Sequence, residues 1–440
     1  MTAFSDFPAP KDFPNYMHNT KMREYLTLYA DRIGFKAYVK LNHELINCEQ
    51  NDDYEGTGRW RLTVRDILRN CVFHDVFDGV MVCTGNYSKP LMPELKNQSI
   101  FKGLVLHSHE FKHANGFEGK RVVVVGIGNS GADIGVELSN VCKNVYLSTR
   151  DGSWIASRSG PMGQPFDTFL LRRSLYSMYK LLPYGLSCWA LEKYLHIRFD
   201  HKLYALKPKH RVLSQHIVIN DELPKKIMTG LAHIKPDIQE FTENGVIFRG
   251  ETHETTCDAV IYATGYEISY PFISQTLLSV NKSDFNLYKH IFSPHLTHPQ
   301  TLAFIGCIVP FGALAPVAEL QSRYFALLMA NKLQTPHKKQ MLSDIKHRKA
   351  WVKKYFPDCE KFALHVHYVE YMEEMARIIG VKPKLFKYFF TDPKLWCHLY
   401  FGPCVPYQYR LNGPNKWSNA REAILTVNDR IKAPFKTRHE

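Results

Sequence analysis

The stretch Arg121-Val-Val-Val-Val-Gly-Ile-Gly-Asn-Ser-Gly131 decides the fold of this chain. Its run of valines is typical of a parallel strand that is buried on both faces. A helix-like segment follows at Ala132–Leu138, and a second apolar run follows at Val145–Thr149. Strand, glycine turn, helix and strand within roughly 30 residues is the order that a dinucleotide-binding unit needs.

Each of the three glycines in this turn has its own physical task. Gly126 permits a tight turn, Gly128 lets the backbone approach a pyrophosphate, and Gly131 lets the helix pack closely on the strand. The phosphates of a dinucleotide are then expected on the free amides at the positive end of the helix.

The residue after the second strand, Arg150, indicates which dinucleotide binds. This position usually faces the adenine ribose, where an acid favours NAD and a cation matches a 2′-phosphate. Asp151 follows directly, so an acid is present but displaced by one position. We therefore predict NADPH rather than NADH.

Composition narrows the classes of protein. A chain of 440 residues predicts more than one packed unit, and its net charge of +14 predicts an anionic partner such as a phosphorylated cofactor or an acidic membrane surface. Nucleic acid is disfavoured because the basic residues are spread out and no zinc-finger or RNA-binding signature occurs. The ten cysteines show no C-x-x-C spacing, so no metal site is predicted.

One apolar stretch, Thr301–Ala318, is long enough to raise the question of a membrane span. Pro310, Gly312 and Pro316 divide it into pieces that are too short to cross a bilayer. A buried strand followed by a turn is the favoured interpretation.

An internal repeat suggests where the chain crosses between two units. Asp78–Gly85 and Asp258–Gly265 share an Asp, an apolar run and a Thr-Gly ending. For Lys338–Lys354, a basic helical stretch, a solvated face and contact with an acidic membrane are both open. Periodicity predicts further strands and helices at Thr20–Ile33, Tyr38–Ile46, Gly58–Val64, Phe77–Gly85, His365–Ile379 and Lys394–Phe401, the last capped by Asp392-Pro393.

A second motif stands just before the glycine turn. Phe101-Lys-Gly103-Leu-Val-Leu-His107-Ser-His-Glu-Phe111 fits the pattern F-x-G-x-x-x-H-x-x-x-(Y/F). This resembles the fingerprint of the flavin-containing monooxygenases, whereas the related Baeyer–Villiger enzymes usually end it in Trp. The resemblance runs nearly end to end, through Asn220–Pro224, Ala263–Tyr266 and Glu319–Gln321 among other segments.

The resemblance implies an α/β fold with two Rossmann-like, dinucleotide-binding domains and a helical C-terminal region. Residues 1–88 would be a remnant of the FAD-binding domain, residues 89–256 an inserted NADPH-binding domain with an irregular insertion at 151–256, and residues 257–440 the return to the FAD domain. We expect the FAD domain to be N-terminally truncated, with the family's flavin-side Asn upstream of Met1. The hydrophobic C-terminal anchor that family members often carry is also expected to be missing.

The same resemblance implies an NADPH- and FAD-dependent monooxygenase. One oxygen atom would pass from O2, through a flavin C4a-hydroperoxide, to a soft nitrogen or sulfur nucleophile. Amines or sulfides would be the substrates, with Baeyer–Villiger oxidation of ketones as the alternative. Because the flavin carries the chemistry, no catalytic side chain is assigned.

Site residues follow from the matched positions. Phe101 and Phe111 are expected to pack, with Gly103 between them in the fingerprint, and His107 to brace the link between domains rather than to transfer a proton. NADP is expected to contact Gly126, Gly128, Asn129, Ser130, Gly131, Ala132, Asp133 and, at the 2′-phosphate, Arg150, while Thr84, Thr264 and Gln321 are expected near the flavin or the domain crossings.

Two further expectations concern the chain as a whole. The resemblance implies the cytosolic face of the endoplasmic reticulum membrane, while the lack of a spanning segment leaves the cytosol open. A truncated FAD domain is expected to hold FAD weakly. A non-catalytic, NADPH-binding pseudoenzyme is therefore the competing hypothesis.

Overall fold

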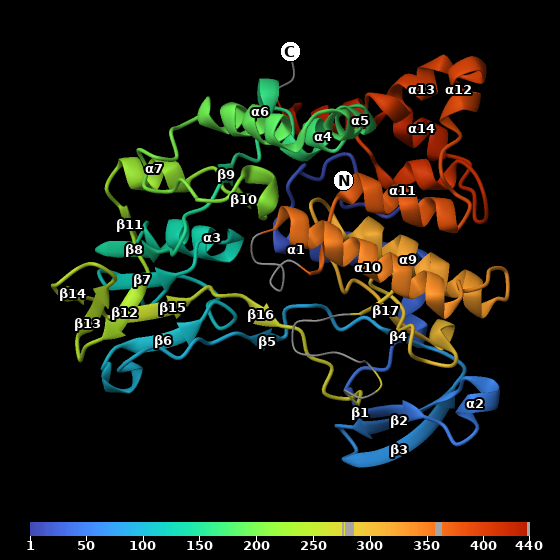
Figure 1. The fold of residues 1–440 in the computed structure, drawn as a ribbon, viewed down its shortest axis with the longest axis horizontal. Helices are drawn as coiled ribbons and strands as arrows, with labels where there is room; N and C mark the ends of the chain where they lie inside the picture. The colour runs from blue at the N-terminus through green and yellow to red at the C-terminus, as the bar shows by residue number, and fades with distance from the viewer. Residues whose placement is uncertain (275–276, 278–285, 357–362, 438–440) are drawn as a thin grey trace.

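The computed structural model of the chain describes residues 1–274, 277, 286–356 and 363–437. Figure 1 shows a lobe built around a parallel sheet on the left and a lobe rich in helices on the right, with a layer of helices along the top. This mixed α/β architecture agrees with the predicted class.

The sheet of the first lobe has five parallel strands and contains the glycine turn. Its spatial order is β11 (Ala232–Lys235), β8 (Asn144–Ser148), β7 (Arg121–Val125), β15 (Ala259–Tyr262) and β6 (Leu104–His107). The valines of β7 are almost fully buried, as a central strand covered on both faces requires. After β7 the chain turns through α3 (Asn129–Leu138) to β8 on one side, while β15 and β6 lie on the other. The glycine turn therefore stands at the switch point of the sheet, where such folds bind ligands.

The sheet extends beyond the limits predicted for its domain. β15 pairs with β6 and β7, so the chain leaves this sheet after Tyr262 rather than at residue 257. The predicted irregular insertion at 151–256 is also too broad. Its last part contains β11, which joins the sheet beyond β8, and the antiparallel strands β12 (Ile238–Phe241), β13 (Gly245–Phe248) and β14 (Thr255–Thr256).

The two crossings between the lobes lie side by side. β5 (Lys89–Pro90) and β16 (Tyr266–Glu267) pair antiparallel in the middle of Figure 1. The Lys89 ammonium lies 2.6 Å from the Glu267 carboxylate, and the Leu91 amide donates to the Gly265 carbonyl over 3.0 Å. The internal repeat correctly indicated both crossing points, and their pairing makes them one ribbon.

The second lobe is organised around a short parallel pair, β4 (Val80–Val82) and β17 (Leu302–Phe304). The helices of this lobe are α9 (Leu314–Met329), α10 (Lys338–Tyr355) and α11 (Tyr368–Ile378). N-terminal segments complete the lobe: α1 (Asn19–Arg32), α2 (Tyr54–Thr57) and an antiparallel sheet of β1 (His43–Gln50), β2 (Trp60–Asp66) and β3 (Cys71–Phe77).

Most local predictions for this lobe are confirmed, with shifted limits. α1 begins at Asn19, one residue before the predicted start, and the His18 side chain caps it by accepting from the Thr20 amide. The helix predicted from His365 begins at Tyr368, because His365 and Val366 pair as β19 with β18 (Val309–Pro310). The apolar stretch from Thr301 forms the buried strand β17 and then a turn into α9, as expected.

Helices from two distant parts of the chain form the layer along the top of Figure 1. They are α4 (Phe166–Leu170), α5 (Arg173–Leu181) and α6 (Tyr184–His196), and α12 (Leu385–Thr391), α13 (Pro393–Tyr400), α14 (Ala420–Leu425) and α15 (Val427–Lys432). Asp392 caps α13 through the Leu395 amide, as predicted. Arg173 of α5 joins the two groups, since its guanidinium donates to the Leu399 carbonyl of α13 over 2.6 Å. The same buried guanidinium lies 2.6 Å from the Glu373 carboxylate of α11, which ties the layer to the second lobe.

The basic stretch predicted as helical forms α10. Most of its cations are exposed, but Arg348 turns inward and donates to the Leu287 carbonyl over 2.9 Å. Met341, Ile345 and Val352 form its buried face. Across the described ranges of the chain, no helix combines the length and the apolar character needed to traverse a bilayer.

Candidate dinucleotide site

The backbone of the glycine turn meets its surroundings differently at each glycine. Gly126 has a φ of +105°, and a Cβ there would lie 2.5 Å from the Ala263 carbonyl oxygen. A Cβ on Gly131 would overlap the Gly126 carbonyl oxygen. At Gly128, by contrast, no atom lies within 4 Å of the Cβ position. The turn is thus closed toward the protein and open where a pyrophosphate is expected to approach.

The helix after the turn presents free amides to this open side. α3 begins at Asn129, its N-cap is Gly128, and no side chain caps it. Asn129 and Ser130 are exposed, whereas Gly131 and Ala132 are buried. The Ala132 amide already donates to the Gly128 carbonyl, so neither this amide nor the buried methyl group is left for a nucleotide. Ala132 therefore packs the helix on the sheet, although it was expected to line the ligand.

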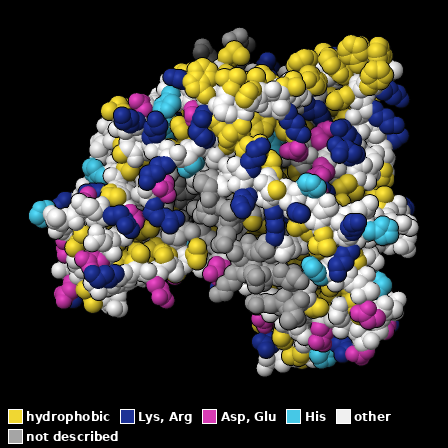
Figure 2. Space-filling view, viewed as in Figure 1, with side chains coloured by type: hydrophobic (Ala, Val, Ile, Leu, Met, Phe, Trp, Pro, Cys, Tyr) yellow, Lys and Arg dark blue, Asp and Glu magenta, His cyan; other side chains and the backbone are white. Residues whose placement is uncertain are grey.

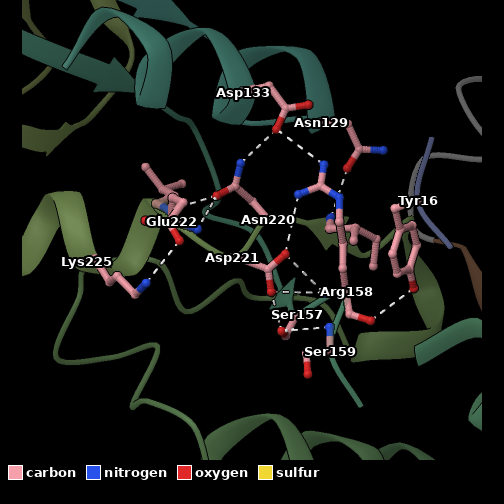
Figure 3. Close-up of polar contacts among 12 residues, drawn as sticks. Tyr16, Asn129, Asp133, Ser157, Arg158, Ser159, Asn220, Asp221, Glu222 and Lys225 are labelled. Carbon is pink, nitrogen blue, oxygen red and sulfur yellow. Dashed lines mark hydrogen bonds and ion pairs between the residues drawn. The ribbon is translucent and has the colours of Figure 1, made fainter. Parts of the chain in front are cut away.

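A polar network connects α3 to the segments that face it (Figure 3). The Asn129 side-chain oxygen accepts from the Ile219 amide over 2.9 Å. The Asp133 carboxylate accepts from the Asn220 side chain over 2.8 Å and lies 3.7 Å from the Arg158 guanidinium. Asn129 and Asp133 are thus held by protein partners, which fixes the entrance of the turn.

Asp221 is the centre of charge in this network. It accepts from the Ser157 hydroxyl and lies 3.4 Å from both Arg158 and Arg198. Burial raises the pKa of Asp221, but the Ser157 hydroxyl and the two guanidinium groups outweigh it and hold the pKa below its ordinary value. The carboxylate therefore stays ionised and remains paired with these two guanidinium groups.

Arg150 differs from those arginines. It follows β8 at the carboxyl edge of the sheet, it is exposed, and no hydrogen bond or ion pair to another described residue is recorded for it. Asp151 beside it is exposed as well. A cation without an internal carboxylate remains free to bind a phosphate.

The histidine of the fingerprint lies where the carboxyl ends of β6 and β15 meet the crossing ribbon. His107 is buried, its Nδ1 accepts from the His109 amide over 3.1 Å, and its Nε2 lies 3.0 Å from the Gly265 carbonyl oxygen. Burial lowers the pKa of His107 below its ordinary value, which favours the neutral ring with its proton on Nε2. This ring ties β6 to the ribbon, the geometry that bracing requires.

The other fingerprint residues pack. The Phe101 and Phe241 ring centroids are 5.4 Å apart, and those of Phe111 and Phe117 are 5.9 Å apart. A Cβ on Gly103 would lie 2.7 Å from the Asp258 carbonyl oxygen, so this glycine allows β6 to approach the chain entering β15.

The three residues expected near a flavin occupy different settings. Thr84 follows β4 and is exposed, and the Thr264 hydroxyl donates to the Leu91 carbonyl beside the ribbon. Gln321 is fully buried, its oxygen accepts from the Gly306 amide and its nitrogen donates to the Tyr371 hydroxyl, each over 2.8 Å. Gln321 thus supports the Gly306 loop from behind.

The carboxyl end of β4 fits a flat polar ring. Asn86 is buried, and its side-chain nitrogen donates to the Gly306 carbonyl over 2.9 Å, while its side-chain oxygen has no partner. No atom lies within 4 Å of a Cβ placed on Gly85 or Gly306. Within the described residues, however, a G-x-G-x-x-G turn that opens a helix occurs only after β7, so this lobe offers no second cradle of that kind for a pyrophosphate.

Three residues that hold the entrance of the glycine turn were not predicted from the sequence: Ser157, Arg158 and Asp221. A signal for part of this network was present, because Asn220–Pro224 belongs to the segments that resemble the family. Asn220 is tied to the start of α7 (Leu223–Met228), since its side-chain oxygen accepts from the Leu223 amide over 2.7 Å. Its contact to Asp133 spans 87 positions and was not visible in the pattern.

A parallel sheet, a glycine turn at its switch point and a helix terminus without a side-chain cap together define a dinucleotide-binding protein. This chain belongs to the flavin-binding monooxygenase-like family, whose model matches residues 1–440. It is 42% identical over 440 residues to flavin-containing monooxygenase 5 of Cavia porcellus and 40% identical to dimethylaniline monooxygenase [N-oxide-forming] 2 of Mus musculus. In both comparisons all of this chain aligns with 82% of the relative's length.

Solved structures share the fold at lower identity. S-allyl-L-cysteine S-oxygenase from Allium sativum matches with a TM-score of 0.63 and 17% identity, over 99% of this chain and 82% of that one. A complex of OTEMO with FAD and NADP matches with a TM-score of 0.59 and 15% identity, over 83% and 84% of the two chains. The resemblance noted from the sequence is thus confirmed at the level of the family.

Two glycine substitutions separate the binding role of the turn from its packing role. Gly128→Ala adds a methyl group to open space, so we expect stability within about 0.5 kcal/mol of the original chain but weaker NADP+ binding. In Gly131→Ala the new methyl group meets the Gly126 carbonyl oxygen and pushes the helix away from the turn. We expect this to lower the free energy of unfolding by roughly 1–3 kcal/mol. Urea denaturation measures the stability of each variant, and calorimetric titration measures its affinity for NADP+. Gly185→Ala is the control, because its Cβ position is also open. Unchanged NADP+ affinity in Gly128→Ala contradicts the assignment.

Proposed function

We propose that this chain serves FAD- and NADPH-dependent monooxygenation, in which one oxygen atom of O2 is transferred to a soft nitrogen or sulfur nucleophile. The observation that carries the proposal is the open glycine turn with the unpaired Arg150 beside it, in a chain of this family. The mouse relative is an N-oxide-forming dimethylaniline monooxygenase by name, which favours an amine as the substrate.

In this function, backbone amides and side chains bind and position the cofactor. The amides at the start of α3 hold the NADPH pyrophosphate, and Arg150 holds the 2′-phosphate. Asn129 and Asp133 orient the entrance through their bonds to Ile219, Asn220 and Arg158. His107 keeps the end of β6 against the ribbon, so the nucleotide site and the second lobe hold a fixed relation.

Bound FAD would supply the redox chemistry and the activation of O2. The described residues suited to its ring are Asn86, with its unpartnered oxygen, and the Gly85 and Gly306 backbones, which leave open space beside it. The start of α9, which no side chain caps, adds a positive helix end in the same lobe.

A second candidate function is a non-catalytic, NADPH-binding pseudoenzyme. It is favoured by the finding that only one cradle of the G-x-G-x-x-G type occurs among the described residues. Ketone oxygenation of the Baeyer–Villiger kind remains a substrate alternative within the enzymatic proposal. The visible flavin spectrum and the rates of substrate oxidation distinguish these candidates.

The direct test is to incubate the purified chain with FAD, remove the excess, and record the visible flavin spectrum and NADPH-dependent O2 uptake. The enzymatic proposal expects stoichiometric flavin and substrate-dependent uptake, with dimethylaniline and a thioether oxidised faster than a cyclic ketone. Absence of bound flavin, together with intact NADP+ binding, would instead establish the pseudoenzyme. Faster oxidation of the ketone would move the substrate assignment to the Baeyer–Villiger class.

The choice of cofactor depends on Arg150. Arg150→Ala is expected to weaken NADPH binding roughly tenfold to a hundredfold, since hydrogen bonds to charged groups contribute about 1.5–3 kcal/mol, and to leave NADH binding unchanged. Lys143→Ala is the matched control, because it removes a cation just before β8, at the opposite edge of the sheet. If both nucleotides are weakened equally, Arg150 does not read the 2′-phosphate.

We also infer that the helix layer contacts a membrane surface, in keeping with the endoplasmic reticulum location that the family resemblance implies. Figure 2 shows hydrophobic side chains gathered along this layer at the top of the view. Leu181 and Phe386 are 85% and 83% exposed, and Phe390 is 68% exposed. Apolar patches of this kind are rare on surfaces that face only water.

Replacing Phe386 and Phe390 with Ser is expected to reduce co-sedimentation with phospholipid vesicles, since each phenylalanine loses about 1.5–3 kcal/mol of burial in the bilayer interface. Leu68→Ser is the control, because Leu68 is 78% exposed in the turn between β2 and β3, far from this layer. Equal losses in both variants would show that the layer has no special affinity for lipid.

A further inference from the structure

A cavity of about 390 Å³ lies in the helix layer, apart from the glycine turn. One side is formed by the segment around Met162 and Gln164, and the other by α13 to α15 with Phe401 between them. Its floor is a short antiparallel bridge, in which Arg172 pairs with Pro403. The volume is in the range of sites that bind small organic molecules.

Two consecutive arginines leave this floor on opposite sides. Arg172 has an extended backbone, so its side chain and that of Arg173 point in opposite directions. Arg173 is buried and carries its own counter-charge, with Glu373 2.6 Å away and the Leu399 carbonyl 2.6 Å away. Arg172 instead lines the cavity.

Arg172 has no such counter-charge. Its Nε donates to the Thr168 carbonyl over 2.9 Å, and its guanidinium lies 5.6 Å from the centre of the Phe169 ring. For its two terminal nitrogens no partner is recorded among the described residues, and no Asp or Glu belongs to the residues that line the cavity. Burial alone lowers the pKa of Arg172, with no acid to oppose it. Arg172 is half-buried, and a partly desolvated cation of this kind is stabilised when an anion joins it.

The remaining walls are mainly apolar and continue to the surface, with Gln164, His398 and Asn428 as the polar residues of the lining. Val405, Ile424 and Val427 line the interior, and Met162 and Phe401 stand at the rim, where they are 92% and 51% exposed. An anion without an apolar part would leave these walls wet, and an apolar molecule without an anion would leave Arg172 unpaired. The cavity therefore matches a molecule that has both parts.

We propose that this cavity binds an anionic amphiphile, with a carboxylate or phosphate head on the terminal nitrogens of Arg172 and an alkyl chain along Val405, Ile424 and Val427. The planar guanidinium offers two parallel donors to such a head. The exposed rim lets the chain enter from the apolar layer. This site is separate from the dinucleotide site and does not depend on the proposed oxygenation.

The test is a titration of the full chain with 11-dansylaminoundecanoic acid, followed by fluorescence and by displacement with oleate. We expect saturable binding at one site, displacement by oleate, and no displacement by oleyl alcohol, which lacks the charge. Arg172→Gln is expected to weaken the probe about tenfold or more. Asn428→Trp, an exposed position at the cavity, is expected to block the probe while leaving Arg172 in place.

Lys387→Gln on α12 is the matched control, since it removes one exposed cation of the same layer that does not line the cavity. A second arm compares vesicles of phosphatidylcholine alone with vesicles that also contain phosphatidic acid. If Arg172→Gln loses binding of the probe in the first arm, the ligand is a free fatty acid. If Arg172→Gln loses the preference for vesicles that contain phosphatidic acid in the second arm, the ligand is a lipid headgroup. Each variant's melting temperature confirms that it is folded. Wild-type behaviour of Arg172→Gln and Asn428→Trp in both arms, or displacement by oleyl alcohol as effective as by oleate, overturns the proposal.

Discussion

The close approach of the Gly126 backbone to the Ala263 carbonyl oxygen is the contact on which the rest of the first lobe depends. It brings the turn after β7 against the chain leaving β15, so that two neighbouring parallel strands end at one place. Gly131 then holds α3 against the same turn. Ala263 stands only two positions before Gly265, whose carbonyl oxygen holds His107 and the crossing ribbon. The dinucleotide turn and the link between the lobes are therefore built on one short stretch of backbone.

Charge in this chain is used in two ways. At the entrance to the turn, Arg158 and Arg198 share the Asp221 carboxylate, and Asp133 also lies near Arg158. In the helix layer Arg173 pairs with Glu373. These pairs order the segments that they join, at a cost in desolvation that their hydrogen bonds offset. Arg150 and Arg172 lack a recorded internal carboxylate among the described residues, and each stands at an opening. We therefore propose anion sites at these two unpaired arginines, rather than wherever positive charge is in excess.

Features that depend only on residues close in the sequence were predicted correctly. The valine run and the three glycines were sufficient for the sheet and the turn, because each acts through its own backbone. The preference for NADPH that Arg150 indicates stays a prediction. The place of β15 was not predicted, because an apolar run does not specify which of two sheets a strand joins. The partners of Asp133 and the cavity beside Arg172 arise from contacts between distant segments, for which one sequence carries no direct signal. Ala132 was assigned to the ligand by its position in the motif, whereas its burial assigns it to packing.

We propose that the turn from Gly126 to Gly131 and Arg150 together form one NADP site beside the crossing ribbon. A crystal structure of the chain soaked with NADP+ tests this most directly. We expect the pyrophosphate on the amides at the start of α3, over Gly128, and the 2′-phosphate within hydrogen-bonding distance of the Arg150 guanidinium. A nucleotide bound elsewhere, or one whose 2′-phosphate points away from Arg150 into solvent, would contradict it.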